Sequence, residues 1–150
     1  MSMMDRTDER ILQTLSENGR ISNVELADRV GLSPSACLRR VQSLERSGVI
    51  RGYRAVLDPQ RLGIGFIAFV SVGLSEHSKQ AQREFEAAMA DAPEIRECHN
   101  VTGAFEYLLR VELPDLSGYK RLHTDVIGTA PHVTSISTHV VIESPKDVPR

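Results

Sequence analysis

The sequence predicts an α+β protein in which an N-terminal unit of three short helices precedes a C-terminal unit with the element order βαββαβ. Two observations predict this division. Up to Leu57, apolar residues recur at intervals of three and four, and glycines end the periodic stretches. From Ile64 onward, short runs rich in Val, Ile and Phe alternate with helical stretches. We therefore expect a first domain at 1–57, a linker at 58–63 and a second domain at 64–150.

Start and stop signals define the first two helices. One helix is expected from Asp5 to Glu17, where Asn18-Gly19 stops it. The next is capped by Ser22 and ended by Gly31, because a left-handed residue at a helix C-terminus costs glycine little. The apolar positions of these helices and of a third helix should form one small core. Its expected members are Ile11, Leu12, Leu15, Leu26, Val30, Leu38, Val41 and Leu44.

The third helix carries the most informative surface of the chain. Ser33 is its N-cap, and Pro34 occupies the first helical position, where a missing N–H is harmless. With its apolar side turned inward, Ser35, Arg39 and Ser43 form an outer polar stripe at i+4 spacing. Two short helices, a glycine turn and a cationic outer stripe on the second helix are typical of helix-turn-helix DNA-binding proteins.

Positive charge is concentrated around this third helix. Residues 33–54 contain five arginines and one acid, although the whole chain has a formal net charge of −2. Two short β segments around Gly52, at 49–51 and 53–57, are expected to form a hairpin, or wing, that follows the helix in the sequence. Arginines on the helix suit paired hydrogen bonds to guanine, and those on the wing suit phosphate. The candidate DNA-binding residues are Ser33, Pro34, Ser35, Ala36, Arg39, Arg40, Ser43, Arg51 and Arg54.

The second half predicts a four-stranded antiparallel sheet with two helices on one face. The strands are expected at 64–74, 95–101, 106–112 and 133–142, and the first helix at 78–90. Inward-facing residues of a second helix are expected to be Leu116, Tyr119, Leu122 and Val126. The strands carry apolar residues on both faces, so the face without helices should meet a second copy in a dimer. Ordinary apolar surface is the alternative.

Several classes of protein are disfavoured by composition. The charged N-terminus, MSMMDRTDER, is unlike a signal peptide, and no apolar run approaches the ~20 residues that span a bilayer, so no membrane partner is expected. Cys37 and Cys98 lie far apart and fit reduced thiols in a cytoplasmic protein. The histidines do not cluster at metal-ligand spacings, and no metal site, catalytic residue or phosphate loop is expected. The chain is therefore not expected to be an enzyme.

Motifs in both halves point to one family. They are Gly19-Arg20-Ile21-Ser22, Val30-Gly31-Leu32-Ser33-Pro34, Gly48-Val49-Ile50, Glu97-Cys98-His99, Thr102-Gly103-Ala104-Phe105-Glu106-Tyr107 and Pro131-His132-Val133. With them, residues 5 to about 143 resemble the Lrp/AsnC family of bacterial transcription regulators, in particular its leucine-responsive members. The resemblance implies an N-terminal winged helix-turn-helix domain and a C-terminal ferredoxin-like domain. It also implies dimers that assemble into octamers or similar discs, and control by amino acids.

A candidate effector site lies in the segment 102–106. From the residues alone, this segment fits a plain β-turn in which Gly103 supplies a positive φ. Alternatively, its exposed N–H groups could hold the carboxylate of an amino acid, and Glu106 could accept from the ammonium group. The resemblance implies an effector pocket between dimers, formed by this loop and the last strand, although the family usually has aspartate at Glu106. The candidate effector-binding residues are Asn100, Thr102, Gly103, Ala104, Phe105, Glu106, His139 and Val140.

The expected function is therefore that of a sequence-specific DNA-binding transcription regulator. It should bind double-stranded DNA, associate with copies of itself, lie in the cytoplasm on the nucleoid, and need no cofactor beyond an amino-acid-like effector. Two alternatives stay open at this point. One is an architectural, DNA-bending protein that responds to no effector, and the other is a small enzyme that uses the ferredoxin-like half.

Overall fold

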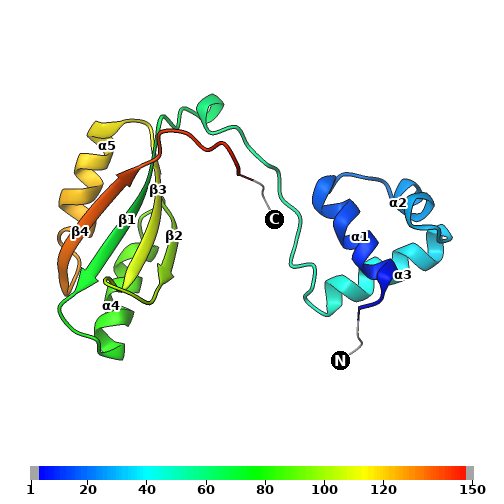
Figure 1. Cartoon of the computed structure of the whole chain (residues 1–150), viewed down its shortest axis with the longest axis horizontal. Coiled ribbons are helices and arrows are strands. Elements are labelled where there is room, and N and C mark those ends of the chain that lie inside the picture. The colour runs from blue at the N-terminus through cyan, green and yellow to red at the C-terminus, as the bar shows by residue number, and fades with distance from the viewer. Residues whose placement is uncertain (1–3, 148–150) are drawn as a thin grey trace. The chain divides into compact units, whose positions relative to one another are not determined.

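The computed structural model of the protein describes residues 4–147 and divides the chain between Val56 and Leu57 into two compact units. The N-terminal unit contains three helices, and the C-terminal unit contains a sheet with its helices (Figure 1). The two units have separate hydrophobic cores. Among the described residues, every helix is too short or too polar to cross a bilayer.

The three helices of the N-terminal unit begin and end at the predicted signals. They are α1 (Arg6–Glu17), α2 (Asn23–Val30) and α3 (Pro34–Arg46). The hydroxyl of Ser22 accepts from the Glu25 amide at 3.1 Å, and Gly31 ends α2 with a φ of 74°. Ser33 caps α3, with Pro34 in its first turn. The local chemistry of caps and turns therefore places the helix-turn-helix correctly.

The core of this unit differs from the prediction at one position of α3. Leu38 is 46% exposed, whereas Cys37 is fully buried. The inward face of α3 passes through Cys37, Val41 and Leu44, at i, i+4 and i+7, so Leu38 turns outward. Ile11, Leu26 and the other predicted core residues pack as expected. Ala27 joins them.

The predicted β hairpin at 49–57 is wrong, because the described chain forms no strand there. The Ile50 amide donates to the carbonyl of Leu44 at 3.0 Å, which ends α3 with a turn around Gly48. Residues 51–58 are exposed and irregular, without a ladder of hydrogen bonds. The β-favouring side chains of Tyr53, Val56 and Leu57 thus have no adjacent strand to pair with in a single chain.

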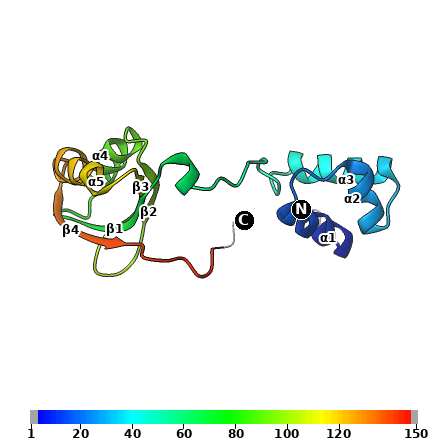
Figure 2. The same cartoon turned by 90° about the horizontal axis from the view of Figure 1, so that it is seen from above.

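The C-terminal unit has the predicted βαββαβ order. Its sheet has the spatial order β2-β3-β1-β4, with antiparallel pairing throughout. Figure 2 shows α4 and α5 on the same side of this sheet. The elements are η1 (Gln60–Leu62), β1 (Phe66–Leu74), α4 (Lys79–Ala90), β2 (Ile95–Asn100), β3 (Tyr107–Leu113), α5 (Leu116–Arg121), η2 (Leu122–Ile127, a π-helical turn) and β4 (Val133–Val140).

Strand β1 lies inside the sheet, between β3 and β4, and organises the core. Its alternate residues from Phe66 to Leu74 are buried against the helices, as are Tyr107 and Leu109 of β3. One predicted core residue is wrong, because Leu116 is 66% exposed. Leu116 is the first residue of α5, where the helix has only begun to pack, and the core contacts start at Tyr119.

One ion pair ties α1 to α3. Asp5 caps α1 by accepting from the amides of Thr7 and Asp8, and Asp8 accepts in return from the Asp5 amide. The Arg40 guanidinium of α3 lies 2.7 Å from Asp5 and 3.0 Å from Asp8. The Asp8 amide and then Arg40 hold the pKa of the Asp5 carboxyl below its ordinary value of 3.8. The ion pair therefore fixes the α1–α3 packing while Asp5 is ionised.

This arrangement predicts acid sensitivity in the N-terminal unit. Because folding lowers the pKa of Asp5, its contribution is complete above the ordinary value of 3.8 and is lost as the pH falls through the lowered folded value. Asparagine also caps helices but does not titrate. Below pH 3.8, Asp5→Asn should show a thermal midpoint that depends less on pH than that of the wild type, by circular dichroism. Parallel midpoint curves for the two proteins would contradict this assignment.

Candidate DNA-binding and effector sites

The outer stripe of α3 is free to meet a partner. Ser35, Arg39 and Ser43 are all exposed. No hydrogen bond or ion pair within residues 4–147 occupies the Arg39 guanidinium. At the start of the helix, the Ser33 hydroxyl accepts from the Ala36 amide at 3.2 Å, so this side chain already has a structural role. The stripe thus presents one cation and small polar side chains along one side of the helix, as the sequence predicts.

Arg40 lies beside this stripe but is engaged elsewhere. Its side chain is 36% exposed and its guanidinium is held by Asp5 and Asp8. The same two carboxylates raise the pKa of the guanidinium, with Asp5 as the larger cause. Of the two neighbouring arginines, Arg39 is therefore the one whose charge is available.

A second contact fixes the start of α3. The side-chain amide of Asn23, at the start of α2, donates to the carbonyl of Pro34 at 2.8 Å. Sequence reasoning missed both Asn23 and the carboxylates of Asp5 and Asp8 as groups that orient α3. The capping pair Asp5-x-x-Asp8 is recognisable in the sequence, but its contact to a residue more than thirty positions away is not.

Arg51 and Arg54 lie on the exposed segment that follows α3. Both are exposed, and between them the Tyr53 hydroxyl donates to Glu45 at 2.9 Å. Because the expected hairpin is absent, no strand pairing orients these two arginines. They can supply positive charge beside α3, without the geometry that base recognition requires.

The loop 102–106 joins β2 to β3 and is fastened at its base. The Val101 amide donates to the carbonyl of Glu106 at 2.9 Å, and the Glu106 amide donates to the carbonyl of Val72 at 3.1 Å. The side-chain amide of Asn100 also donates to the Glu106 carbonyl. Gly103 has a φ of 119°, which confirms the predicted need for glycine in this turn.

The tip of this loop remains open. Thr102, Gly103 and Ala104 are exposed, and Phe105 is half-buried. Glu106 turns back from the tip, so that its Oε2 accepts from the Leu74 amide at 2.7 Å and its Oε1 lies 3.2 Å from Nδ1 of His77. The Glu106 side chain is 17% exposed, whereas that of His77 is 82% exposed. One carboxylate oxygen is therefore anchored by backbone, and the other faces a group that is easily displaced.

The structure does not bring the predicted last-strand residues to this loop within one chain. The loop enters β3 at Tyr107, which pairs with Val72 of β1. His139 pairs instead with Phe69, which precedes Val72 by three residues in β1. Three residues of a strand span ~10 Å, so His139 lies that far along the sheet from the base of the loop. Val140 lies one residue beyond, against Ala68. The candidate effector residues thus form two separate groups on a single chain.

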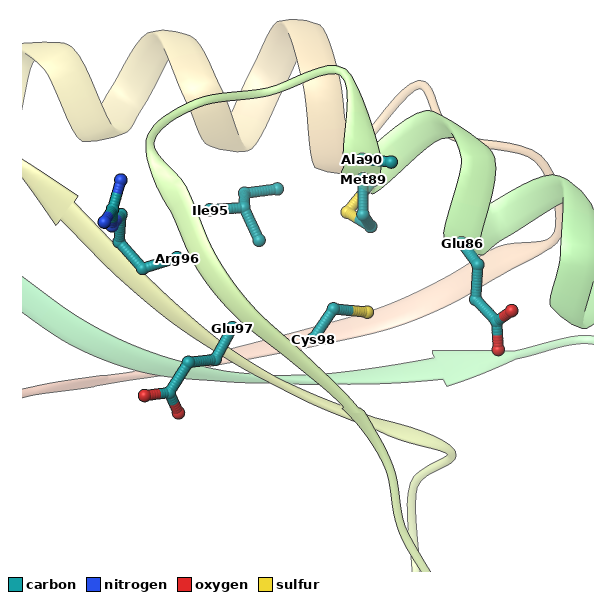
Figure 3. Close-up of a pocket in the computed structure, with 7 residues that line it drawn as sticks. All are labelled: Glu86, Met89, Ala90, Ile95, Arg96, Glu97 and Cys98. Atoms are coloured by element: carbon teal, nitrogen blue, oxygen red, sulfur yellow. The ribbon is translucent and has the colours of Figure 1, made fainter. Parts of the chain in front are cut away.

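A separate cleft of about 380 Å³ lies between α4 and the edge strand β2. In Figure 3, Met89, Ile95 and Cys98 point into this space, while Arg96 and Glu97 point away from it. Burial, and then the Glu86 carboxylate, raise the pKa of the Cys98 thiol to about 11. The thiol is thus protonated near neutral pH. Groups of three or more His, Cys, Asp or Glu that could hold a metal do not occur in the part of the chain that the structure describes.

Comparison with known proteins identifies both units. Residues 4–51 match the winged helix-turn-helix DNA-binding family, and residues 67–150 match the Lrp/AsnC ligand binding domain. Leucine-responsive regulatory proteins of Salmonella typhimurium and of Escherichia coli K12 are 45% and 44% identical to this chain, over 95% of it and 87% of each relative.

Solved structures agree over nearly the whole chain. The transcriptional regulator NMB0573 of Neisseria meningitidis, in complex with L-Met, superimposes with a TM-score of 0.93 and 37% identity, covering 97% of this chain and 94% of that one. Escherichia coli AsnC gives a TM-score of 0.85 at 26% identity, over 97% and 96% of the chains. The helix-turn-helix with its outward stripe and the βαββαβ unit are therefore the two domains of a transcription regulator, and the chain belongs to the Lrp/AsnC family.

Proposed function

We propose that this regulator recognises specific base pairs by placing the N-terminal half of α3 in the major groove. The observation that carries the proposal is the exposed stripe of α3, in which the Arg39 guanidinium has no partner among the described residues. A free guanidinium on a rigid helix can donate two hydrogen bonds to guanine. Ser35, Ala36 and Ser43 flank it with small side chains that allow close approach. Amides at the start of the helix, beside Ser33 and Pro34, would face phosphate.

Arg51 and Arg54 are assigned to the phosphate backbone. Their exposure and lack of an oriented scaffold suit contacts that add affinity without sequence preference. The positive stretch 33–54 is small, so one copy alone would bind weakly. Two linked copies would bind more tightly, because the second contact becomes intramolecular.

A dimer through the open face of the sheet would supply those two copies. On β1 and β3, alternation places Ile67, Phe69 and Leu108 on the side away from the helices. The Arg110 guanidinium lies 5.5 Å from the centre of the Phe69 ring on this face. An apolar patch with one cation suits burial against a second copy, and further assembly of dimers into octamers is part of the same proposal. The assembled protein would act on the nucleoid in the cytoplasm.

The proposed effector is an amino acid that binds at the loop 102–106 at an interface between copies. Exposed amides near Gly103 would hold its carboxylate, and Oε1 of Glu106 would accept from its ammonium group in place of His77. Since His139 and Val140 lie away from this loop on one chain, a neighbouring copy would supply them. The resemblance to the L-Met complex supports an amino acid as the effector class. Ligand binding between copies would change the distribution of assemblies.

Catalysis forms no part of this proposal, because the family consists of transcription regulators. An architectural DNA-bending role without an effector is the competing function, and ligand experiments distinguish the two.

Matched arginine variants test the DNA assignment. Arg39→Ala should lose preference at one base position, by about 1–3 kcal/mol of discrimination. Arg54→Ala should weaken binding to all sequences alike and reduce the salt dependence. Duplexes selected from a random pool by the wild type and each variant, followed by anisotropy titrations at several salt concentrations, measure both effects. Unchanged base preferences for Arg39→Ala would remove Arg39 from the recognition surface.

Light scattering tests the effector assignment. Among the twenty amino acids, one or a few should change the oligomer mass or the DNA affinity of the wild type. Gly103→Ala should abolish this response, because its φ of 119° strains any side chain. Gly63→Ala is the matched control: it places a side chain at another positive φ, of 77°, outside the site, and should leave the response intact. A wild type indifferent to every amino acid, in both mass and affinity, would favour the architectural role.

A further inference from the structure

We propose that Arg40 is a positioning residue that holds the recognition helix α3 against the N-terminus of α1, and that it does not contact DNA. Arg39 and Arg40 are neighbours in the sequence and chemically identical. Their surroundings differ, however. Arg39 is exposed without a described partner, whereas Arg40 is half-buried in an ion pair with two carboxylates.

The geometry of the ion pair is specific. A single guanidinium nitrogen, Nη1, makes both contacts, at 2.7 Å to Oδ2 of Asp5 and at 3.0 Å to Oδ1 of Asp8. The other oxygen of each carboxylate is used within α1: Oδ1 of Asp5 accepts from two amides, and Oδ2 of Asp8 accepts from the Asp5 amide. All four oxygens therefore have donors. Arg40 binds the two carboxylates that form the capping box of α1.

The ion pair acts together with a second contact on α3. The side chain of Asn23 holds the Pro34 carbonyl at the beginning of α3, and Arg40 lies about two turns further along. Cys37, between these two points, is fully buried. One contact fixes the start of the helix against α2, and the other fixes its middle against α1. Together they set how α3 is rotated and tilted, and thus where Arg39 points.

If Arg40 bound DNA, its ion pair with Asp5 and Asp8 would have to break, whereas Arg39 has no such ion pair to lose. Asp8 has a side chain only 19% exposed, and moving Arg40 to a phosphate would leave this carboxylate without its counter-charge. The freed acid would also lie in the same small unit as the DNA-binding surface, where its charge repels phosphate. A role within the protein therefore suits Arg40 better than a contact to the nucleic acid.

The two roles predict different behaviour in conservative variants. Because one nitrogen makes both contacts, a lysine ammonium can replace it with modest loss. Paired recognition of guanine needs the guanidinium fork, so lysine is a poor substitute at a base-contacting position. Arg40→Lys should therefore retain function, whereas Arg39→Lys should not. This pair of variants at adjacent positions provides its own control.

The experiment uses the full-length protein with two probes: a duplex selected from a random pool by the wild type, and a mixed-sequence duplex of equal length. Arg40→Ala should weaken binding to the selected duplex by about three- to tenfold, because Arg39 is oriented less well, and should weaken binding to the mixed-sequence duplex by less. Arg40→Lys should stay within about twofold of the wild type on both duplexes. The salt slope of both variants should match the wild type, and neither variant should lose preference at a base position that Arg39→Ala leaves intact. Arg39→Lys should lose affinity only for the selected duplex.

Three results would overturn the proposal. They are a preference lost in either Arg40 variant at a base position that Arg39→Ala leaves intact, a salt slope reduced by about one in Arg40→Ala, and wild-type affinity of Arg40→Ala for the selected duplex. Thermal unfolding by circular dichroism verifies that each variant is folded at the titration temperature. If Arg40→Ala is unfolded there, the base preference and salt slope of Arg40→Lys decide the question.

Discussion

The contact between Arg40 and the capping carboxylates of α1 is the constraint on which the DNA-binding half of this protein depends. A recognition helix discriminates base pairs only if its rotation about its own axis is fixed, since a small rotation moves a side chain from one hydrogen-bonding position to another. The small core of Ile11, Leu26 and Cys37 provides burial but is non-directional. The ion pair and the Asn23 contact provide the direction. In this proposal, base discrimination by Arg39 would depend on residues that do not contact DNA.

The C-terminal unit differs from the N-terminal unit in that one face of its sheet is left without helices. Its sheet buries one face fully under α4 and α5 and leaves Ile67, Phe69 and Leu108 on the other. The loop 102–106 and the residues His139 and Val140 lie at different levels of the same sheet. In the proposed assembly, another copy would complete both the hydrophobic face and the ligand site. Sensing and assembly are then one physical event, which is how a small ligand could change the spacing of DNA-binding helices.

Sequence reasoning succeeded where the determining chemistry is local. Ser22 and Ser33 cap helices, and Gly31 ends one, through contacts to residues nearby in the sequence, so the caps and turns were predicted correctly. The βαββαβ order was also predicted correctly. Sequence reasoning failed where contacts to residues distant in the sequence determine the structure. Leu38 and Leu116 have apolar side chains at plausible spacing, but tertiary packing turns them outward. The hairpin predicted at 49–57 does not form, because no strand lies beside this segment in one chain. Arg39 and Arg40 of α3 looked equivalent in the sequence, because the acids that distinguish them lie more than thirty residues away.

The most direct test of this account is the DNA affinity of the double variant Asp5→Asn, Asp8→Asn. Asparagine keeps the helix cap, so the variant removes two negative charges near the DNA-binding surface with little change to α1. Charge alone would then make binding tighter, since repulsion of phosphate decreases and Arg40 is released. The account predicts the opposite sign: weaker binding to the selected duplex at low salt, because α3 loses its anchor. Tighter binding would show that Arg40 serves DNA and that the orientation of α3 does not depend on this contact.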